Sequence, residues 1–211
     1  MTGKTASTMH RTLRGLVHAA ALCLALVTSP AAGQETHERR TVTPHASKQF
    51  TTFIHSTGNY AVDHPSDWHA HERVDRTNIG AEDGLVAGAR GFRTIYGVIV
   101  QVAPDPLAGS PERTTEASAR LILEQVLKRN PHQALKEPVS ADRPLAGAPA
   151  FRALIMGTSP VTGRGERAEI VVRQHGANEV FYLVLVSPVD EYKLLEAPLR
   201  RLRDSVRIPG R

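Results

Sequence analysis

Cysteine is nearly absent from this sequence of 211 residues, since Cys23 is the only one. A single cysteine allows no disulfide within the chain, so the fold must be held together by its packed core. Cys23 lies inside an apolar stretch near the N-terminus and follows Leu22. A bacterial lipoprotein would need a small residue before its lipid-modified cysteine, so the sequence argues against a lipid anchor.

Long apolar stretches are also scarce. The longest, residues 15–28, is shorter than the ~20 apolar residues that a membrane-spanning helix needs. Three basic residues and no acidic one precede it, and small residues follow it. This order is typical of a secretory signal peptide. We predict that residues 1–33 are a signal peptide, cleaved near Gly33-Gln34, and that the mature chain is secreted or periplasmic without a transmembrane segment.

The excess of positive charge is small. The chain has 26 Lys and Arg residues against 21 Asp and Glu residues, a formal net charge of +5. Lys4, Arg11 and Arg14 belong to the predicted signal peptide, and without them 23 basic residues stand against 21 acidic ones. A charge so nearly balanced is not typical of nucleic-acid-binding domains, and we expect no nucleic-acid partner.

Apolar periodicity is missing from residues 34–48 (QETHERRTVTPHASK), which are mostly polar or charged. We predict that they form a flexible leader. The rest of the mature chain has the length of one domain, which we expect at residues 49–208.

The remaining sequence alternates between strand and helix patterns. Alternating or continuous apolar residues bounded by Gly and Pro predict strands. These are 50–55, 60–64, 68–74, 85–89, 96–103, 135–140, 150–157, 166–175 and 180–187. Apolar residues at helical spacing predict helices at 115–129 and 189–205. The short hairpin connections favour an α+β fold, with an antiparallel sheet of about six or more strands packed with two main helices. The strand at 180–187 is apolar nearly throughout, so it should be central in the sheet.

Several segments of the domain resemble PsbP-like domains. They are Tyr60-Ala-Val-Asp-His-Pro-Ser-Asp-Trp68, Leu145-Ala-Gly-Ala-Pro-Ala150, Phe181-Tyr-Leu-Val-Leu-Val-Ser-Pro188 and Asp204-Ser-Val-Arg-Ile208. The likeness covers about residues 50–208, and it departs from the family pattern at His64, where the family often has Tyr. The resemblance implies an antiparallel sheet between helices and a non-catalytic role in binding or assembly. In particular, the chain resembles the module appended to some bacterial secreted zinc metallopeptidases, so a metallopeptidase is a possible partner.

Common catalytic motifs are missing. The sequence has no His-Glu-x-x-His zinc-peptidase motif, because the dipeptides at His37 and His71 lack a second histidine one helical turn later. Ser66 and Ser159 do not lie in a Gly-x-Ser-x-Gly elbow, and residues 157–165 lack the Gly-Lys end of a phosphate loop. Glu166 and Glu169 should face opposite sides of their strand, which makes them a poor acid–base pair. We therefore predict no catalytic residue.

Four histidines leave one alternative open. His69 and His71 are two residues apart, so they share one face of a strand, and His55 or His64 could come from a neighbouring strand. Such imidazoles could hold zinc or copper. We favour solvent-exposed histidines without a metal and expect no cofactor. The four arginines near the C-terminus, Arg200, Arg201, Arg203 and Arg207, are likewise expected on a solvated helix face.

The sequence predicts an exported, non-catalytic binding or accessory domain that acts through an envelope or secreted protein. One alternative is a metal-binding protein that uses the histidines. The other is a hydrolase whose site has no known motif; a cavity with converging titratable groups would favour it.

Overall fold

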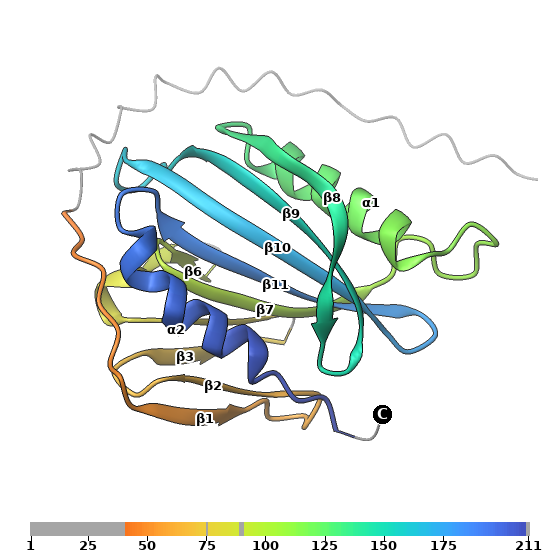
Figure 1. The fold of residues 1–211 in the computed structure, drawn as a ribbon, viewed down its shortest axis with the longest axis horizontal. Coiled ribbons are helices and arrows are strands. Elements are labelled where there is room, and N and C mark those ends of the chain that lie inside the picture. The colour runs from red at the N-terminus through yellow and green to blue at the C-terminus, as the bar shows by residue number, and fades with distance from the viewer. Residues whose placement is uncertain (1–40, 75, 89–90, 210–211) are drawn as a thin grey trace, which may run out of the picture. The chain divides into compact units, whose positions relative to one another are not determined.

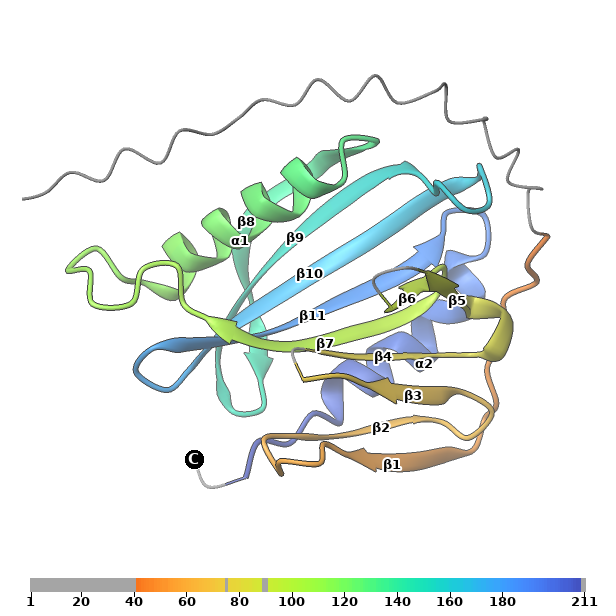
Figure 2. The ribbon, with the colours of Figure 1, turned by 180° about the vertical axis from the view of Figure 1, so that it is seen from behind.

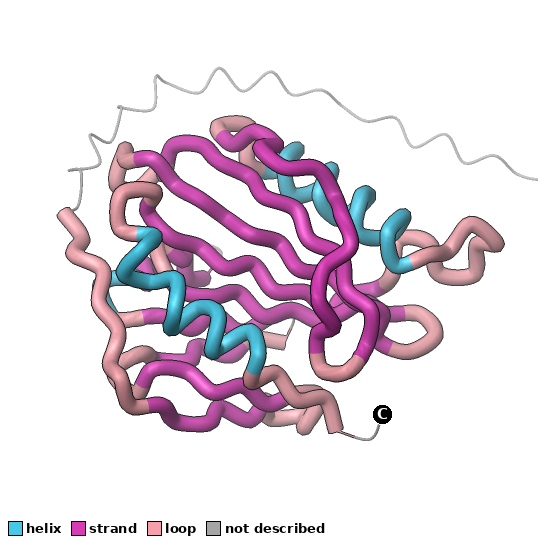
Figure 3. The backbone as a smooth tube through the Cα atoms, viewed as in Figure 1, coloured by secondary structure: helices cyan, strands magenta, loops and turns pink. Residues whose placement is uncertain are grey.

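The computed structural model describes residues 41–74, 76–88 and 91–209 (Figure 1). The predicted signal peptide and the first part of the predicted leader lie outside the described residues. Strands dominate the described chain, as the tube in Figure 3 shows. The two helices are α1 (Thr115–Arg129) and α2 (Tyr192–Asp204). The strands are β1 (Phe50–Ile54), β2 (Ala61–Pro65), β3 (His69–Glu72), β4 (Arg76–Gly80), β5 (Leu85–Gly88), β6 (Gly91–Thr94), β7 (Gly97–Pro104), β8 (Gln133–Leu145), β9 (Ala148–Thr158), β10 (Gly165–His175) and β11 (Glu179–Pro188). A short 3₁₀ turn, η1 (Glu82–Gly84), lies between β4 and β5.

Seven of these strands form one sheet in the order β3-β4-β7-β11-β10-β9-β8, and every neighbouring pair is antiparallel. Two smaller hairpins, β1–β2 and β5–β6, lie outside this sheet. Two helices packed with a large antiparallel sheet confirm the expected α+β fold class.

Strand β11 is the centre of the sheet, as its apolar sequence predicts. Its residues alternate between two separate core clusters. Phe181 and Leu183 belong to one cluster, whereas Val180 and Val184 belong to the other. Because successive side chains of a strand point to opposite faces, both faces of the sheet at β11 are packed.

The two helices lie on opposite faces of the sheet. In Figure 1, α2 crosses the face toward the viewer, and in Figure 2, from behind, α1 lies on the near face. Helix α2 packs on β11 and β2, whereas α1 packs on β8, β9 and β10. We call the α2 side the closed face and the α1 side the open face, because α1 covers only the β8–β10 half of it.

The predicted leader is wrong for its described part. Residues 41–48 have no regular structure, yet Val42 is 2% exposed and belongs to the core of the closed face. The indole Nε1 of Trp68 donates a hydrogen bond of 2.9 Å to the backbone oxygen of His45. Pro44 is buried as well, and Ala46 packs against the same core. Of these three residues only Val42 is strongly apolar, which is why the sequence pattern did not reveal this packing.

Both helices follow from their sequences. Thr114 caps α1, since its Oγ1 accepts a hydrogen bond of 3.0 Å from the backbone N–H of Ala117. The helix ends before Pro131, which disfavours helical conformation in the preceding residue. In α2 the buried leucines Leu195, Leu199 and Leu202 recur at helical spacing. Among the described residues, neither helix combines the length and the apolar character needed to cross a membrane.

Strand β4 was not predicted. Its sequence, RTNIG, shows no alternation of apolar and polar residues, yet four of its five residues are buried between β3 and β7. Its pairing partners decide its conformation. This strand supplies part of the cavity described next.

Candidate functional site

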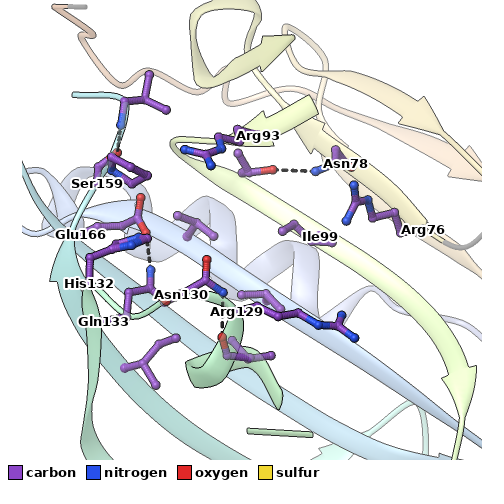
Figure 4. Close-up of a pocket in the computed structure, with 18 of the residues that line it drawn as sticks. Arg76, Asn78, Arg93, Ile99, Arg129, Asn130, His132, Gln133, Ser159 and Glu166 are labelled. Atoms are coloured by element: carbon purple, nitrogen blue, oxygen red, sulfur yellow. Dashed lines mark hydrogen bonds between the residues drawn. The ribbon is translucent and has the colours of Figure 1, made fainter. Parts of the chain in front are cut away.

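The uncovered half of the open face is hollowed into a cavity of about 570 Å³ (Figure 4). Its walls come from β4, β6, β7, β9, β10 and β11, from the first residue of β8, from the C-terminal end of α1, and from the loops after α1 and β9. We call it the open-face cavity. It exists because α1 packs mainly on β8, β9 and β10 and covers less of β11, β7 and β4 on this face.

The floor of the cavity is largely apolar. Ile99 of β7 and Val184 and Val186 of β11 line it. Near them, the hydroxyl of Tyr182 donates a hydrogen bond of 2.5 Å to Oε1 of Gln101. These residues are the open-face members of two neighbouring strands, whose alternate residues fill the closed-face core.

Basic side chains gather around this floor. Arg76 comes from β4, Arg93 from β6, Arg129 from the last residue of α1, and His132 from the loop that follows. Arg93, Arg129 and His132 are exposed. In the view of Figure 4, His132 lies at one end of the cavity and Arg76 at the other. Only Arg129 and His132 lie close together in the sequence, so no sequence motif could have identified these four basic residues as a group.

Of the described residues that line the cavity, Glu166 is the single acidic one, and it is only 8% exposed. Burial raises the pKa of its carboxyl group, although hydrogen bonds from Gln133 and Ser159 and the positive charge of Arg93 act in the opposite direction. Nε2 of Gln133 donates to Oε1 of Glu166 over 2.5 Å. The carboxyl group is thus held in place by its neighbours at the base of the β9–β10 loop.

Ser159 is also tied into this loop. It is 4% exposed, and its hydroxyl oxygen accepts hydrogen bonds of 3.4 Å from the backbone N–H groups of Val161 and Thr162. Its hydroxyl also bonds to Glu166. Ser159 and Glu166 therefore order the loop. Among the described residues, no hydrogen bond joins Ser159 to an imidazole, although His132 lines the same cavity, and a Ser–His nucleophile needs that contact.

The alternation of side chains along a strand predicts that Glu166 and Glu169 face opposite sides of β10, which makes them a poor acid–base pair. The structure agrees. Glu166 lines the open-face cavity, whereas Glu169 lines a smaller cavity of about 100 Å³ beside α2 on the closed face.

The histidines considered for metal binding occupy different environments. His69 and His71 lie two residues apart on β3, the first exposed and the second half-buried. Burial, followed by the charge of His69, lowers the pKa of His71. Among the described residues, no group of three or more His, Cys, Asp or Glu side chains is placed to hold a metal ion.

The expectation that all four histidines are solvent-exposed is wrong for two of them. His55 is 8% exposed, its ring packs 4.7 Å from the ring of Tyr60, and its Nδ1 makes a hydrogen bond of 2.7 Å with Oγ1 of Thr57. His64 is 5% exposed, and its Nδ1 donates to its neighbour's backbone oxygen, that of Pro65, over 2.8 Å. Burial lowers the pKa of His64. Both rings fill the hairpin side of the closed-face core.

The prediction that the four C-terminal arginines lie on a solvated helix face is wrong in part. Arg203 is 3% exposed, and its Nη2 lies 2.6 Å from Oδ2 of Asp142 on β8. Arg207 pairs with Asp63 of β2 at 2.8 Å. Arg201 lies over the ring of Phe50, at 3.8 Å from its centroid. These arginines join the C-terminal segment to three strands, because the helix packs across elements that carry the matching groups.

Comparison with known proteins identifies the fold. No protein family and no curated protein matches the sequence. The structure is similar to cyanobacterial PsbP (CyanoP) from Synechocystis sp. PCC 6803, with 8% identity, a TM-score of 0.53, and coverage of 80% of this chain and 98% of that one. LpqN, involved in cell envelope biogenesis of Mycobacterium tuberculosis, gives 15% identity, a TM-score of 0.48, and coverage of 77% and 91%. The Saccharomyces cerevisiae Ran-binding protein Mog1p gives 10%, 0.47, and coverage of 76% and 95%. The first of these matches shows a PsbP-like fold.

Proposed function

We propose that this chain is an exported, non-catalytic binding domain that acts through a protein partner in the periplasm or outside the cell. The observation that carries the proposal is the open-face cavity, a concave surface built on rigid strands and left uncovered by α1. Ligand sites are typically concave and combine apolar surface with polar groups that fix the orientation of the ligand, and this cavity combines an apolar floor with polar and charged side chains.

The face of the sheet is a better binding surface than its edges. Edge strand β8 contains Pro138 and Pro144 and changes register with β9 at three places. Bulges and prolines prevent another strand from adding to an edge. The opposite edge strand, β3, has four residues. The uncovered face therefore remains as the surface on which a partner or ligand would bind.

A binding role fits the side chains of the cavity better than hydrolysis does. A hydrolase needs an activated nucleophile within reach of a base, with room for a substrate beside both. Ser159, the one serine among the described residues that line the cavity, is buried and bonded to loop amides and to Glu166. A binding domain of this kind requires no cofactor.

The class of partner follows from the predicted export of the chain and from its resemblance to PsbP-like domains. A signal peptide at residues 1–33 would place the mature chain among envelope or secreted proteins. Within that class, the resemblance to modules appended to secreted zinc metallopeptidases makes a metallopeptidase the first candidate. The PsbP-like fold supports the resemblance at the level of architecture.

Crosslinking in the native envelope tests the proposal. The full chain with a C-terminal tag is expressed in its own host, crosslinked, recovered from each cell fraction, and its partners are identified by mass spectrometry. The variant Gln101→Trp places an indole in the cavity, and the matched variant Gln125→Trp places one on the exposed surface of α1. We expect the wild type and Gln125→Trp to crosslink one envelope or secreted protein, and Gln101→Trp to lose it. Recovery of the tag in the cytoplasm, or of all three proteins without a partner, would contradict the proposal.

A further inference from the structure

We infer that the open-face cavity binds a small amphiphilic anion, in which a carboxylate or phosphate group is joined to a short apolar body. This inference rests on the proposed use of the cavity as the binding surface, and it names the chemistry of the occupant.

The size of the cavity fits a small molecule. Its volume of about 570 Å³ lies inside the range of roughly 300–1,000 Å³ that is usual for small-ligand sites. The floor offers apolar surface, from half-buried Ile99 and the exposed edges of Val184 and Val186, that an aliphatic or aromatic body would remove from water.

The charge of the lining favours an anion. Three arginines face one glutamate across the cavity, which leaves a formal excess of two positive charges with His132 neutral. Within the described part of the chain, neither Arg93 nor Arg129 forms an ion pair with a carboxylate, although eleven other arginine and histidine side chains do. Their guanidinium groups come from different elements, β6 and α1, and both line the same cavity. Guanidinium groups bind carboxylate and phosphate oxygens through paired N–H donors.

Two sources of negative charge at the cavity disfavour an anion, and local hydrogen bonds weaken the effect of both. The C-terminal end of α1 carries partial negative charge on its last carbonyl groups. Asn130 covers two of these carbonyls, because its Nδ2 donates to the oxygen of Val126 over 2.8 Å and its backbone N–H donates to that of Leu127 over 3.1 Å. The second source is Glu166, which is buried at the base of a loop and engaged by Gln133.

Both parts of the cavity must be used for the binding to be selective. Inorganic phosphate would meet the arginines but leave the apolar floor in water. A neutral alcohol would cover the floor but leave the guanidinium groups without a partner. Only a molecule that combines an anionic group with an apolar body satisfies both.

Calorimetry with matched probes tests this inference on the purified full-length protein. The probes are octanoate, octyl phosphate, 1-octanol and inorganic phosphate, all below the concentrations at which they self-associate. We expect octanoate or octyl phosphate to bind at least about tenfold more tightly than the other two, since each charge-assisted hydrogen bond adds about one tenfold step. The tighter of the two amphiphiles identifies the anionic group.

Variants locate the site. The double variant Arg93→Gln with Arg129→Gln should weaken binding of the amphiphile by about tenfold or more. Lys128→Gln is the matched control, because it removes a neighbouring positive charge on α1 that does not line the cavity. Its affinity should equal that of the wild type. Equal binding of 1-octanol, unchanged binding by the double variant, or no binding of either amphiphile would overturn the inference.

The crosslinking experiment separates this inference from the proposed function. If no amphiphile binds but Gln101→Trp still loses the protein partner, the ligand class is wrong and the binding surface stands. If the amphiphile does not bind and Gln101→Trp also crosslinks like the wild type, the use of the cavity as a binding surface is wrong.

Discussion

The two faces of the seven-stranded sheet are built from alternate residues of the same strands, yet they differ in how they are covered. On the closed face, α2, the β1–β2 hairpin and residues 41–48 bury a cluster rich in aromatic residues. Within it, Tyr60 meets Phe181 edge-on at 5.5 Å and Trp68 meets Tyr96 at 6.0 Å. On the open face, α1 buries small and β-branched side chains over half of the sheet and leaves the rest as the cavity.

Under the proposed function, this difference divides two roles within one sheet. Close packing on one face gives the strands a fixed geometry. The uncovered half of the other face can then present side chains to a ligand. Substitutions on the two faces should therefore have unequal effects on stability and on binding.

The largest effect is expected in the centre of the closed face. Phe181→Ala should lower the free energy of unfolding by about 3–5 kcal/mol, because it removes a fully buried ring and leaves a cavity. The next residue along β11, Tyr182, lies on the open face and is half-buried, so Tyr182→Ala should cost less. Urea unfolding of both variants measures the difference. An equal loss in the two variants would show that the faces are packed alike.

A smaller loss is expected at the ion pair beneath α2. Arg203→Met keeps most of the side-chain volume but leaves Asp142 without its charged partner, so we expect a loss of about 1–3 kcal/mol. Arg200→Met removes an exposed arginine of the same helix and should change stability by less than about 0.5 kcal/mol. If both variants unfold at the same urea concentration, the buried pair does not stabilise the closed face.

The next effect depends on pH and concerns Glu166 on the open face. Burial raises the pKa of this carboxyl group in the folded state above its ordinary value of 4.5. The folded protein then holds the proton more tightly than the unfolded chain does, so this group's contribution to stability falls as the pH rises through the window between those two pKa values. Glu166→Gln should abolish that fall.

Urea unfolding of wild type and Glu166→Gln from about pH 4 to about pH 8 measures this dependence. Glu124→Gln, at an exposed position of α1, serves as the control for the loss of one negative charge. Parallel pH profiles for the wild type and Glu166→Gln would show that burial of the carboxyl group costs the fold nothing.

The smallest effect on stability is expected at the rim of the cavity. Arg93→Gln and Arg129→Gln should each change the free energy of unfolding by less than about 0.5 kcal/mol, because both side chains are exposed. Together with the loss of ligand affinity expected for the double variant, this would separate binding from folding. A loss of stability as large as that of Arg203→Met would assign these arginines a structural role.

Much of the fold could be predicted from local patterns. The alternating and continuous apolar strands, the capped helix α1 and the leucine stripe of α2 all appear in the structure near the predicted positions. The turn at Ala146-Gly147, where both residues have positive φ, matches the predicted break between two strands. Strands β4 and β6 and the packed segment around Val42 were missed. The short sequence of β4 has no apolar alternation, so its pairing with β3 and β7 decides its conformation. Val42 joins a core that later segments build.

The candidate site could not be predicted in the same way. Arg76, Arg93 and Arg129 belong to three elements, and only the pairing of β4 with β7 and the position of α1 bring them together. The histidines and the C-terminal arginines stood out in the sequence, but several of them are part of the packing of the fold. His55 and His64 are buried, and Arg203 joins α2 to β8.

The sequence by itself determined both helices and most of the strands, and it placed β11 at the centre, because apolar periodicity records how much of each segment must be buried. Only the tertiary structure decided that one face of the sheet is closed and the other is half open. That outcome depends on where two helices of limited length lie on a sheet of seven strands, and no local pattern encodes it. The cavity and its arginines follow from this uneven cover.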